Sequence, residues 1–211
     1  MPKNNAIPDS TLFGGNSFFY PSKNDTYICY KTLVKEDRQK LIEGFNRLSA
    51  KSVYHRFFGI MKELSKKQLD GFLSMDNIDH IAWAAFDIID EENVGVGVGR
   101  FKRSKRYPKE AEIALTVIDD YQNLGVGTTL LAILYFLAPK FGIEVFTGII
   151  MADNAKLIHR FKALGAEMKR SGSEYNMRLP VVKSIHHLPN TKYAQTIKHA
   201  LEFLRVNNFC A

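Results

Sequence analysis

Two glycines separated by one residue, Gly125 and Gly127, lie in the segment of this 211-residue chain most suited to ligand chemistry. They follow a run typical of a strand, residues 112–118, and lead into an apolar run typical of a buried helix, residues 128–137. Glycines at such a junction let the chain turn tightly and leave backbone N–H groups pointing outward at the helix start. Such N–H groups attract phosphate, so the segment is predicted to hold a phosphate-bearing ligand.

Two common phosphate-binding patterns fail at named positions. A Walker loop, G-x-x-x-x-G-K-S/T, needs a lysine after its second glycine, and Gly127 is followed by Thr128. A dinucleotide fingerprint, G-x-G-x-x-G, needs a third glycine where this chain has Leu130. The pattern that remains is Q/R-x-x-G-x-G, matched by Gln122, Gly125 and Gly127. A tight turn without a ligand is the alternative.

With this pattern after a strand and at the start of a helix, the chain resembles the GNAT superfamily of acyl-coenzyme A-dependent N-acetyltransferases over about residues 27–181. The resemblance implies that the loop holds the pyrophosphate of acetyl-coenzyme A (acetyl-CoA). It implies that the pantetheine arm pairs with main chain at Val117 and Asp119, and that the N–H of Val117 or Ile118 polarises the thioester, at a bulge that splays this strand from its neighbour. The cofactor-binding residues it implies are Val117, Ile118, Asp119, Gln122, Asn123, Leu124, Gly125, Val126, Gly127, Thr128 and Asn154.

Glu112 is the candidate general base, because an amine must be deprotonated before it attacks a thioester. It stands at the start of the strand that runs into the glycine loop, and the relatives resembled here have a glutamate in a similar motif. Its flanking apolar residues are compatible with a raised pKa. A strand-end glutamate in solvent is the alternative.

A second resemblance concerns the acceptor. Residues 52–58, Ser-Val-Tyr-His-Arg-Phe-Phe, are similar to the SxYxRFF segment of bacterial protein lysine acetyltransferases. The aromatic residues Tyr54, Phe57 and Phe58 are also expected in the core. Arg56 is expected either to line the acceptor entrance or to pair with an acidic residue of the sheet.

The predicted helix at 154–164 supplies the other wall of the site in the family. Asn154 is expected to contact the pantetheine or to cap the helix. Many relatives have a tyrosine seven residues later as the acid that reprotonates the thiolate, and here that position is Phe161. Another group or water must then serve, or the thiolate, whose pKa is roughly 8.5, leaves unprotonated.

Leu124 is a further departure, since many relatives carry glycine or arginine at this point of the loop. Without that cation, Lys156, Arg160 and Lys162 are candidate partners of the 3′-phosphate. Solvated helix residues are the alternative interpretation of all three.

The elements that must position these residues form a mixed sequence of strands and helices. Few parallel crossovers are indicated, which argues against a doubly wound dinucleotide fold and favours a mixed, mostly antiparallel α/β (α+β) sheet flanked by helices. Gly95, Gly97 and Gly99 alternate in one strand and are expected to let another element lie close to the sheet. The predicted strands cover residues 26–34, 80–89, 94–101, 112–118, 145–150 and 174–179. The predicted helices cover residues 35–48, 128–137, 154–164 and 191–206, with a short one capped by Ser65 and Gln68.

Length and a 45% hydrophobic content indicate a single domain at residues 25–181, with an N-terminal extension at 1–24 and a C-terminal helical extension at 182–211. The extensions are expected to cover the acceptor site or to form a dimer contact. A monomer and a homodimer both remain open.

Charge and cysteine content limit the partners. The formal charge of +7 is spread along the chain, so a solvated basic surface or a phosphate-rich cofactor accounts for it, and nucleic acid is not expected. Cys29 and Cys210 have no metal-ligand spacing, so neither a metal site nor a disulfide framework is expected. No apolar stretch approaches the roughly 18 residues of a membrane span, and a cytoplasmic protein is expected.

The sequence therefore predicts an N-acetyltransferase that uses acetyl-CoA and a primary amine, which the second resemblance suggests is a protein lysine. One alternative is an acyltransferase for small-molecule amines such as metabolites or antibiotics. Another is a non-catalytic acyl-CoA-binding regulatory module.

Overall fold

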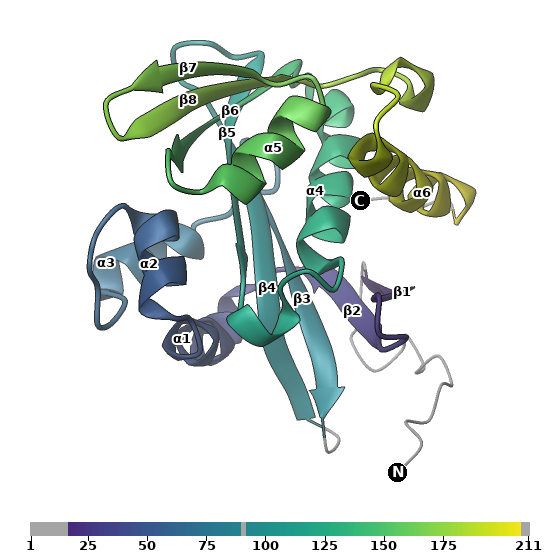
Figure 1. Ribbon diagram of the computed structural model, residues 1–211. Coiled ribbons are helices and arrows are strands. Elements are labelled where there is room, and N and C mark those ends of the chain that lie inside the picture. The colour runs from purple at the N-terminus through teal and green to yellow at the C-terminus, as the bar shows by residue number, and fades with distance from the viewer. Residues whose placement is uncertain (1–16, 90–91, 208–211) are drawn as a thin grey trace.

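One mixed sheet of eight strands organises the computed structural model, which describes residues 17–89 and 92–207 (Figure 1). Its order is β1-β2-β3-β4-β5-β6-β8-β7. Every neighbouring pair is antiparallel except β5 and β6, which run parallel, and this confirms the predicted mixed sheet. The strands are β1 Ser17–Pro21, β2 Tyr27–Thr32, β3 His80–Ile89, β4 Glu92–Arg103, β5 Glu110–Val117, β6 Val145–Met151, β7 Glu167–Ser171 and β8 Glu174–Pro180.

Helices cover both faces of the sheet (Figure 1). On one side α1 packs against β4 and α2 against β5, with α3 beside α2. On the other side α4 lies against β3, β4 and β5 and is itself covered by α6, which also contacts α5. The helices are α1 Arg38–Asn46, α2 Ala50–Phe57, α3 Lys66–Phe72, α4 Val126–Leu137, α5 Ala155–Ala163 and α6 Lys192–Val206. Short 3-10 turns lie at Lys35–Asp37, Asp119–Tyr121, Ala138–Phe141 and Ile185–His187.

Local sequence signals account for several of these helices. Ser65 and Gln68 form the predicted capping box at the start of α3. The helix α4 is buried nearly all round, as its continuous apolar sequence predicts. The helix α2 was not predicted, because eight residues with only Val53 buried give too short a pattern to be recognised as periodic.

A bulge lies in β4 rather than at the predicted place in β5. Ala85 pairs with Gly97 and Phe86 pairs with Gly95, so Val96 is the extra residue. The pairing of β4 with β5 is continuous in register. The expectation of a bulge at Val117 or Ile118 is therefore wrong.

Two of the alternating glycines bring α4 close to the sheet, as predicted. A Cβ at Gly97 would approach the Thr116 carbonyl to 3.1 Å and Leu130 of α4 to 3.2 Å. A Cβ at Gly99 would approach Leu115 to 2.9 Å. Any side chain here would push away the helix that carries the glycine loop.

The terminal segments contribute to the same body of structure. Residues 17–21 of the predicted N-terminal extension form the edge strand β1, while residues 1–16 lie outside the described part. The helix α6 of the predicted C-terminal extension buries an apolar face against α4. The domain boundaries at 24 and 181 stay a prediction. Within the described residues no helix is both long and apolar enough to cross a membrane.

Candidate functional site

The parallel strands β5 and β6 separate after a short contact. They pair only from Glu110 opposite Val145 to Glu112 opposite Thr147. Beyond this point β5 continues along β4, and β6 continues along β8 as far as Met151. A gap therefore opens in the sheet beside the second half of β5.

Hydrogen bonding to β4 decides which N–H groups of β5 face this gap. The N–H of Ile118 donates to the carbonyl of the bulged Val96 at 3.1 Å. In an antiparallel pair, residues bonded to the partner alternate with residues turned away from it. The N–H groups of Val117 and Leu115 therefore point toward the gap. Because the N–H of Ile118 is bonded to Val96, the expectation that it polarises a thioester is wrong. That role stays a prediction for Val117, and the N–H of Leu115 has the same orientation as that of Val117.

The glycine loop at the end of β5 has the backbone geometry of a phosphate site. Gly125 has φ +100°, and Asn123 has φ +68°. The N–H groups of Thr128 and Thr129 donate to the Gly125 carbonyl. Those of Val126 and Gly127 open the helix and have no carbonyl four residues before them within it. These donors and the positive end of the helix dipole suit an anion.

Contacts from distant elements hold this loop. The hydroxyl of Tyr121 donates to the buried carboxylate of Asp87 at 2.6 Å, and burial together with this carboxylate raises the tyrosine's pKa. The N–H of Lys23, between β1 and β2, donates to the Leu124 carbonyl at 2.8 Å. The loop geometry is therefore fixed without a ligand.

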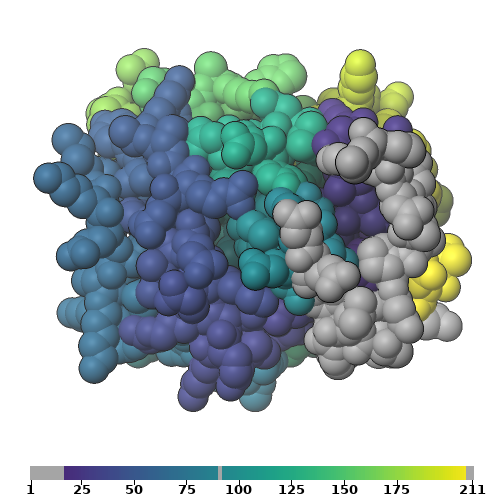
Figure 2. All heavy atoms as spheres, turned by 90° about the horizontal axis from the view of Figure 1, so that it is seen from below, coloured from purple at the N-terminus to yellow at the C-terminus, as the bar shows by residue number. Residues whose placement is uncertain are grey.

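The helix α2 is tied to the same loop through Asp119. Its carboxylate accepts from the N–H and Oγ of Ser49 at 2.9 and 2.8 Å and from Oγ of Ser52 at 3.0 Å. Partial burial would raise the pKa of Asp119, but these hydrogen bonds outweigh burial and lower it. Gln122 donates to Oγ of Ser52 at 3.1 Å and to the Val117 carbonyl at 3.2 Å. Seen from below, the blue surface of α1 and α2 meets the teal surface that carries this loop (Figure 2).

A groove of about 440 Å³ runs between the loop, β5 and α5, which is within the range of small-molecule sites. Its charged lining consists of four cations and two carboxylates. The structure brings together six of the predicted cofactor residues here: Val117, Asp119, Gln122, Asn123, Gly127 and Asn154. The other five, Ile118, Leu124, Gly125, Val126 and Thr128, are not among the residues that line it. The cations are Lys51, Arg56, Lys156 and Arg160, and the carboxylates are Asp119 and Asp153.

The far wall of the groove comes from α5 and α6. Asn154 caps α5, its Oδ1 accepting from the N–H of Leu157 at 3.2 Å, and it also lines the groove. Lys156 donates to the side chain of Asn123 across the groove. Tyr193 of α6 lines the groove too, beside Arg160. Nothing in the sequence near Tyr193 indicated a role in this site.

A second cavity, of about 100 Å³, adjoins the groove and contains Glu112. Glu112 is exposed, and no ion pair involves it within the described residues. Its charge raises the pKa of Arg56 and Arg100 and so opposes the lowering caused by their burial. The five residues that line both spaces, and so mark their junction, are His55, Arg56, Leu115, Leu157 and Phe161.

His55 is the ionisable junction residue that the sequence did not single out. It extends from α2, and its Nε2 lies 3.0 Å from Oδ1 of Asp153, which precedes α5. Its side chain is 15% exposed, against 62% for Asp153. Phe161 contributes a buried, apolar ring to the same junction. The signal was missed because the two partners are 98 residues apart in the chain.

Of the two expectations for Arg56, pairing with an acidic residue of the sheet is wrong, and lining the acceptor entrance stays a prediction. Its Nε donates to Oγ1 of Thr116 at 2.9 Å, so it does not pair with an acidic residue of the sheet. Burial, and then the charge of Arg100, lowers its pKa to about 10, while Glu112 opposes this change. It remains a cation near neutral pH, at the border of the groove and the Glu112 cavity.

The described part of the chain offers neither a metal cluster nor an activated thiol. In residues 17–89 and 92–207 no group of three or more histidine, cysteine, aspartate or glutamate side chains is placed to hold a metal ion. Burial raises the pKa of the Cys29 thiol to about 12, so this residue is not a nucleophile at neutral pH. Cys210 lies outside the described residues.

Comparisons with known proteins point the same way as the geometry. Residues 50–166 match the acetyltransferase (GNAT) family. The chain is 30% identical over 139 residues to Acetyltransferase PA5475 of Pseudomonas aeruginosa, covering 66% of this chain and 74% of that protein. It is 29% identical over 138 residues to Acetyltransferase Pat of Mycolicibacterium smegmatis, covering 64% of this chain but only 40% of that protein.

Solved structures share the fold. The GNAT domain of S. lividans PAT superposes with a TM-score of 0.70 at 24% identity, covering 78% of this chain and 96% of that one. The acetyltransferase yncA from Salmonella typhimurium, solved with its cofactor acetyl-CoA, gives a TM-score of 0.58 at 17% identity, covering 78% of this chain and 98% of that one.

Proposed function

The chain belongs to the GNAT family of acetyltransferases, enzymes that take the acetyl group from acetyl-CoA, and we propose that it transfers this group to a primary amine by direct attack on the thioester. The observation that carries the proposal is the gap beside β5. It joins a groove with free helix N–H groups at one end to a cavity at the other, and that cavity contains Glu112, which has no ion pair within the described residues. Such a layout suits a long donor and a separate acceptor.

Donor binding uses the main chain. The N–H groups at the start of α4 are suited to the pyrophosphate, and Lys51, Lys156 and Arg160 are suited to its charge and to the 3′-phosphate. The exposed edge of β5 is suited to pairing with the pantetheine amides. The bound donor supplies an activated acyl carbon and a thiolate leaving group.

In this mechanism the reacting groups lie near the junction of the groove and the Glu112 cavity. The N–H of Leu115 or Val117 stabilises the negative charge that develops on the thioester oxygen. Glu112 accepts a proton from the acceptor ammonium, directly or through one water, so that the nitrogen lone pair can attack. The N–C bond forms as the C–S bond breaks.

The proton for the departing sulfur comes from His55 in this proposal. Phe161 cannot supply it, and Arg56 is paired with Thr116 and too weak an acid near pH 7. His55 is the one remaining ionisable side chain of the five junction residues, all of which are described. Its imidazolium gives a proton to the thiolate and regains one from solvent, while Asp153 orients the ring.

A protein lysine is a second candidate acceptor, supported by the likeness to the GNAT domain of S. lividans PAT and to Pat of M. smegmatis. The chain spans 40% of the length of the latter, so its acceptor is carried over only as a proposal.

Thiol release tests the proposal. Purified protein is mixed with acetyl-CoA and a panel of primary amines, and free thiol is followed with a chromogenic disulfide. We expect amine-dependent release, and Glu112→Gln should lower it about 100-fold or more while the Kd for acetyl-CoA stays unchanged. Glu167→Gln on the exposed edge strand β7 is the matched control. Tight acetyl-CoA binding with no release for any amine would instead indicate a non-catalytic binding module.

A further inference from the structure

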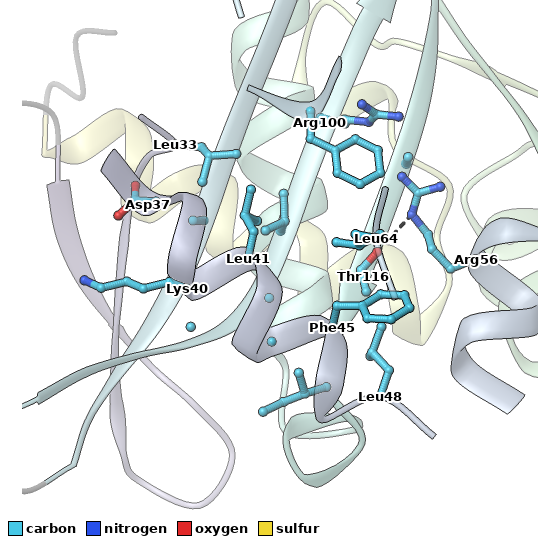
Figure 3. Close-up of a pocket in the computed structure, with 18 of the residues that line it drawn as sticks. Leu33, Asp37, Lys40, Leu41, Phe45, Leu48, Arg56, Leu64, Arg100 and Thr116 are labelled. Atoms are coloured by element: carbon cyan, nitrogen blue, oxygen red, sulfur yellow. Dashed lines mark hydrogen bonds between the residues drawn. The ribbon is translucent and has the colours of Figure 1, made fainter. Parts of the chain in front are cut away.

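An apolar chamber lies between the sheet and the helices α1 and α2, on the face opposite the one that α4 covers. Figure 3 shows the residues that line this chamber. It has a volume of about 90 Å³ and is lined by residues of β3, β4 and β5 and of the helices α1, α2 and α3. Its walls are mainly aliphatic and aromatic, and include Leu41, Phe45, Phe57, Leu64 and Phe72. A cavity of about 150 Å³ admits benzene, so this space suits a group of three or four carbon atoms.

Two guanidinium groups lie toward one end of this chamber, those of Arg56 and Arg100 (Figure 3). Neither forms an ion pair within the described residues. Arg100 lies over the ring of Phe72 at 4.7 Å and Arg56 over the ring of Phe57 at 5.1 Å. Burial lowers the pKa of both, which indicates that their charges are incompletely compensated.

The other charged groups that line the chamber do not neutralise the charges of Arg56 and Arg100. Asp37 and Lys40 lie toward the opposite end (Figure 3). The Asp37 carboxylate is already paired with Lys31 at 2.9 Å, and Lys40 lies over the ring of Phe86. Glu112 is the carboxylate whose charge acts on both Arg56 and Arg100, so two cations share one anion.

The chamber meets the cavity that contains Glu112. Arg56 and Ala114 line both spaces. Glu112, Ala114 and Thr116 are alternate residues of β5, so their side chains share the face on which the chamber lies. An amine held beside Glu112 would thus have a guanidinium pair and an apolar space within reach of its other substituents.

We infer that the acceptor is a free amino acid, or an amine of the same chemistry, whose carboxylate binds between Arg56 and Arg100 and whose short aliphatic side chain fills the chamber. This inference rests on the proposed function and assigns its substrate class. Each guanidinium group presents paired N–H donors that match the two oxygens of a carboxylate, which is the basis of bidentate recognition. A longer acyl chain on the donor is a less suitable occupant, because the hydrogen bond from Arg56 to Thr116 lies between groove and chamber.

The experiment compares kcat/KM across matched acceptors at saturating acetyl-CoA. The panel is L-alanine, L-valine, L-leucine and L-phenylalanine, the primary amide of each, and Nα-acetyl-lysine amide as a substitute for a protein lysine. We expect L-valine and L-leucine to be best, L-phenylalanine to be excluded by size, and each amide to be at least tenfold poorer than its acid. Equal rates for acids and amides, or a preference for the lysine derivative, would overturn the inference and leave the proposed function intact.

Arg100→Gln separates recognition of the carboxylate from folding and catalysis. It should lower kcat/KM for L-leucine at least tenfold, leave that for leucinamide unchanged, and leave the Kd for acetyl-CoA unchanged because Arg100 does not line the groove. An equal fall for acid and amide would contradict carboxylate binding. Binding of N-acetyl-L-leucine to the CoA complex, measured by calorimetry, gives the same comparison without turnover. Absence of thiol release with every amine would count against the proposed function itself.

Discussion

The carboxylate of Asp119 accepts two hydrogen bonds from Ser49, one from its N–H at 2.9 Å and one from its Oγ at 2.8 Å. Ser49 is the N-cap of α2, and Asp119 begins the turn that leads from β5 into the glycine loop. The helix that carries His55 and Arg56 is therefore fastened to the loop that is suited to phosphate. The carboxylate of Asp119 thus holds α2 and the glycine loop together.

Asp119→Ala should lower both stability and donor affinity, because it removes the carboxylate that accepts three hydrogen bonds from the start of α2, and so frees the loop. Loss of a capping interaction typically costs about 1 kcal/mol of unfolding free energy. Chemical denaturation gives the first quantity, and calorimetry with CoA gives the second. Asp120→Ala is the matched control, since Asp120 is exposed and its one ion pair within the described residues is a 3.6 Å contact with Arg47.

The contribution of Asp119 to the free energy of unfolding should also depend on pH. Its pKa is lowered in the folded protein, so the unfolded chain takes up a proton first as pH falls. The stabilisation is complete above the unfolded pKa of about 3.9 and is lost as pH falls through the lower folded value. The stability difference between wild type and Asp119→Ala should thus be constant from pH 7 to about 5 and shrink toward pH 3. A difference that persists at low pH would contradict the charge-based account.

Gly125→Ala should destabilise the fold and weaken CoA binding. Gly125 has φ +100°, a conformation that a residue with a Cβ adopts only with strain, although the nearest atom to such a Cβ is 4.0 Å away. The cost is therefore conformational rather than steric, on the order of 1 kcal/mol or more, which lowers Tm by about 2–4 °C in a chain of this size. Thermal unfolding with and without CoA measures both effects. Gly142→Ala is the control, because Gly142 also has positive φ and open space but lies away from the groove.

His55→Gln should lower kcat about 100-fold with little change in CoA affinity, since glutamine can still hydrogen bond to Asp153 but cannot donate a proton to sulfur. A second readout is the thiolate absorbance of bound CoA near 240 nm, taken as a difference from bound desulfo-CoA. An imidazolium beside the sulfur should lower the pKa of this thiol below its ordinary value of about 8.5, and His55→Gln should restore it. An unchanged thiol pKa in the variant would remove His55 from this role.

Phe161→Tyr should partly rescue kcat in the His55→Gln background. The ring of Phe161 lies at the junction of the groove with the Glu112 cavity, so a phenol there would supply the missing proton donor. In otherwise wild-type protein the same change should have a small effect, because His55 already serves. Phe161→Leu in the His55→Gln background is the control for packing and should give no rescue.

Local patterns account for what the sequence predicts well. Strands β3 and β5 and helix α4 follow from runs of apolar residues, and α6 follows from apolar residues at a helical spacing. The glycine loop follows from spacing within six residues. The edge strand β7, Glu167–Ser171, was missed because four of its five residues are exposed and give no alternation. The bulge at Val96 was misplaced because strand register depends on pairing between strands, which a single sequence does not reveal.

The unpredicted members of the site come from contacts between distant elements. His55 meets Asp153 across 98 residues, and Tyr193 reaches the groove from a helix that was predicted only as an extension. The orientation of the Leu115 and Val117 N–H groups follows from the bond of Ile118 to Val96, which requires the β4–β5 register. Each of these residues has an ordinary sequence context, so only the assembled fold identifies it.

The donors that β5 turns toward the gap belong to the main chain, and this has an evolutionary consequence. Any amino acid except proline supplies an N–H at positions 115 and 117, so Leu115 and Val117 are free to drift to other residues of similar volume without loss of the polarising contact. Selection acts there on strand geometry rather than on side-chain identity. Surveys that rank positions by invariance would pass over two residues that the proposed mechanism places at the reacting centre, whereas a scan with proline would reveal them.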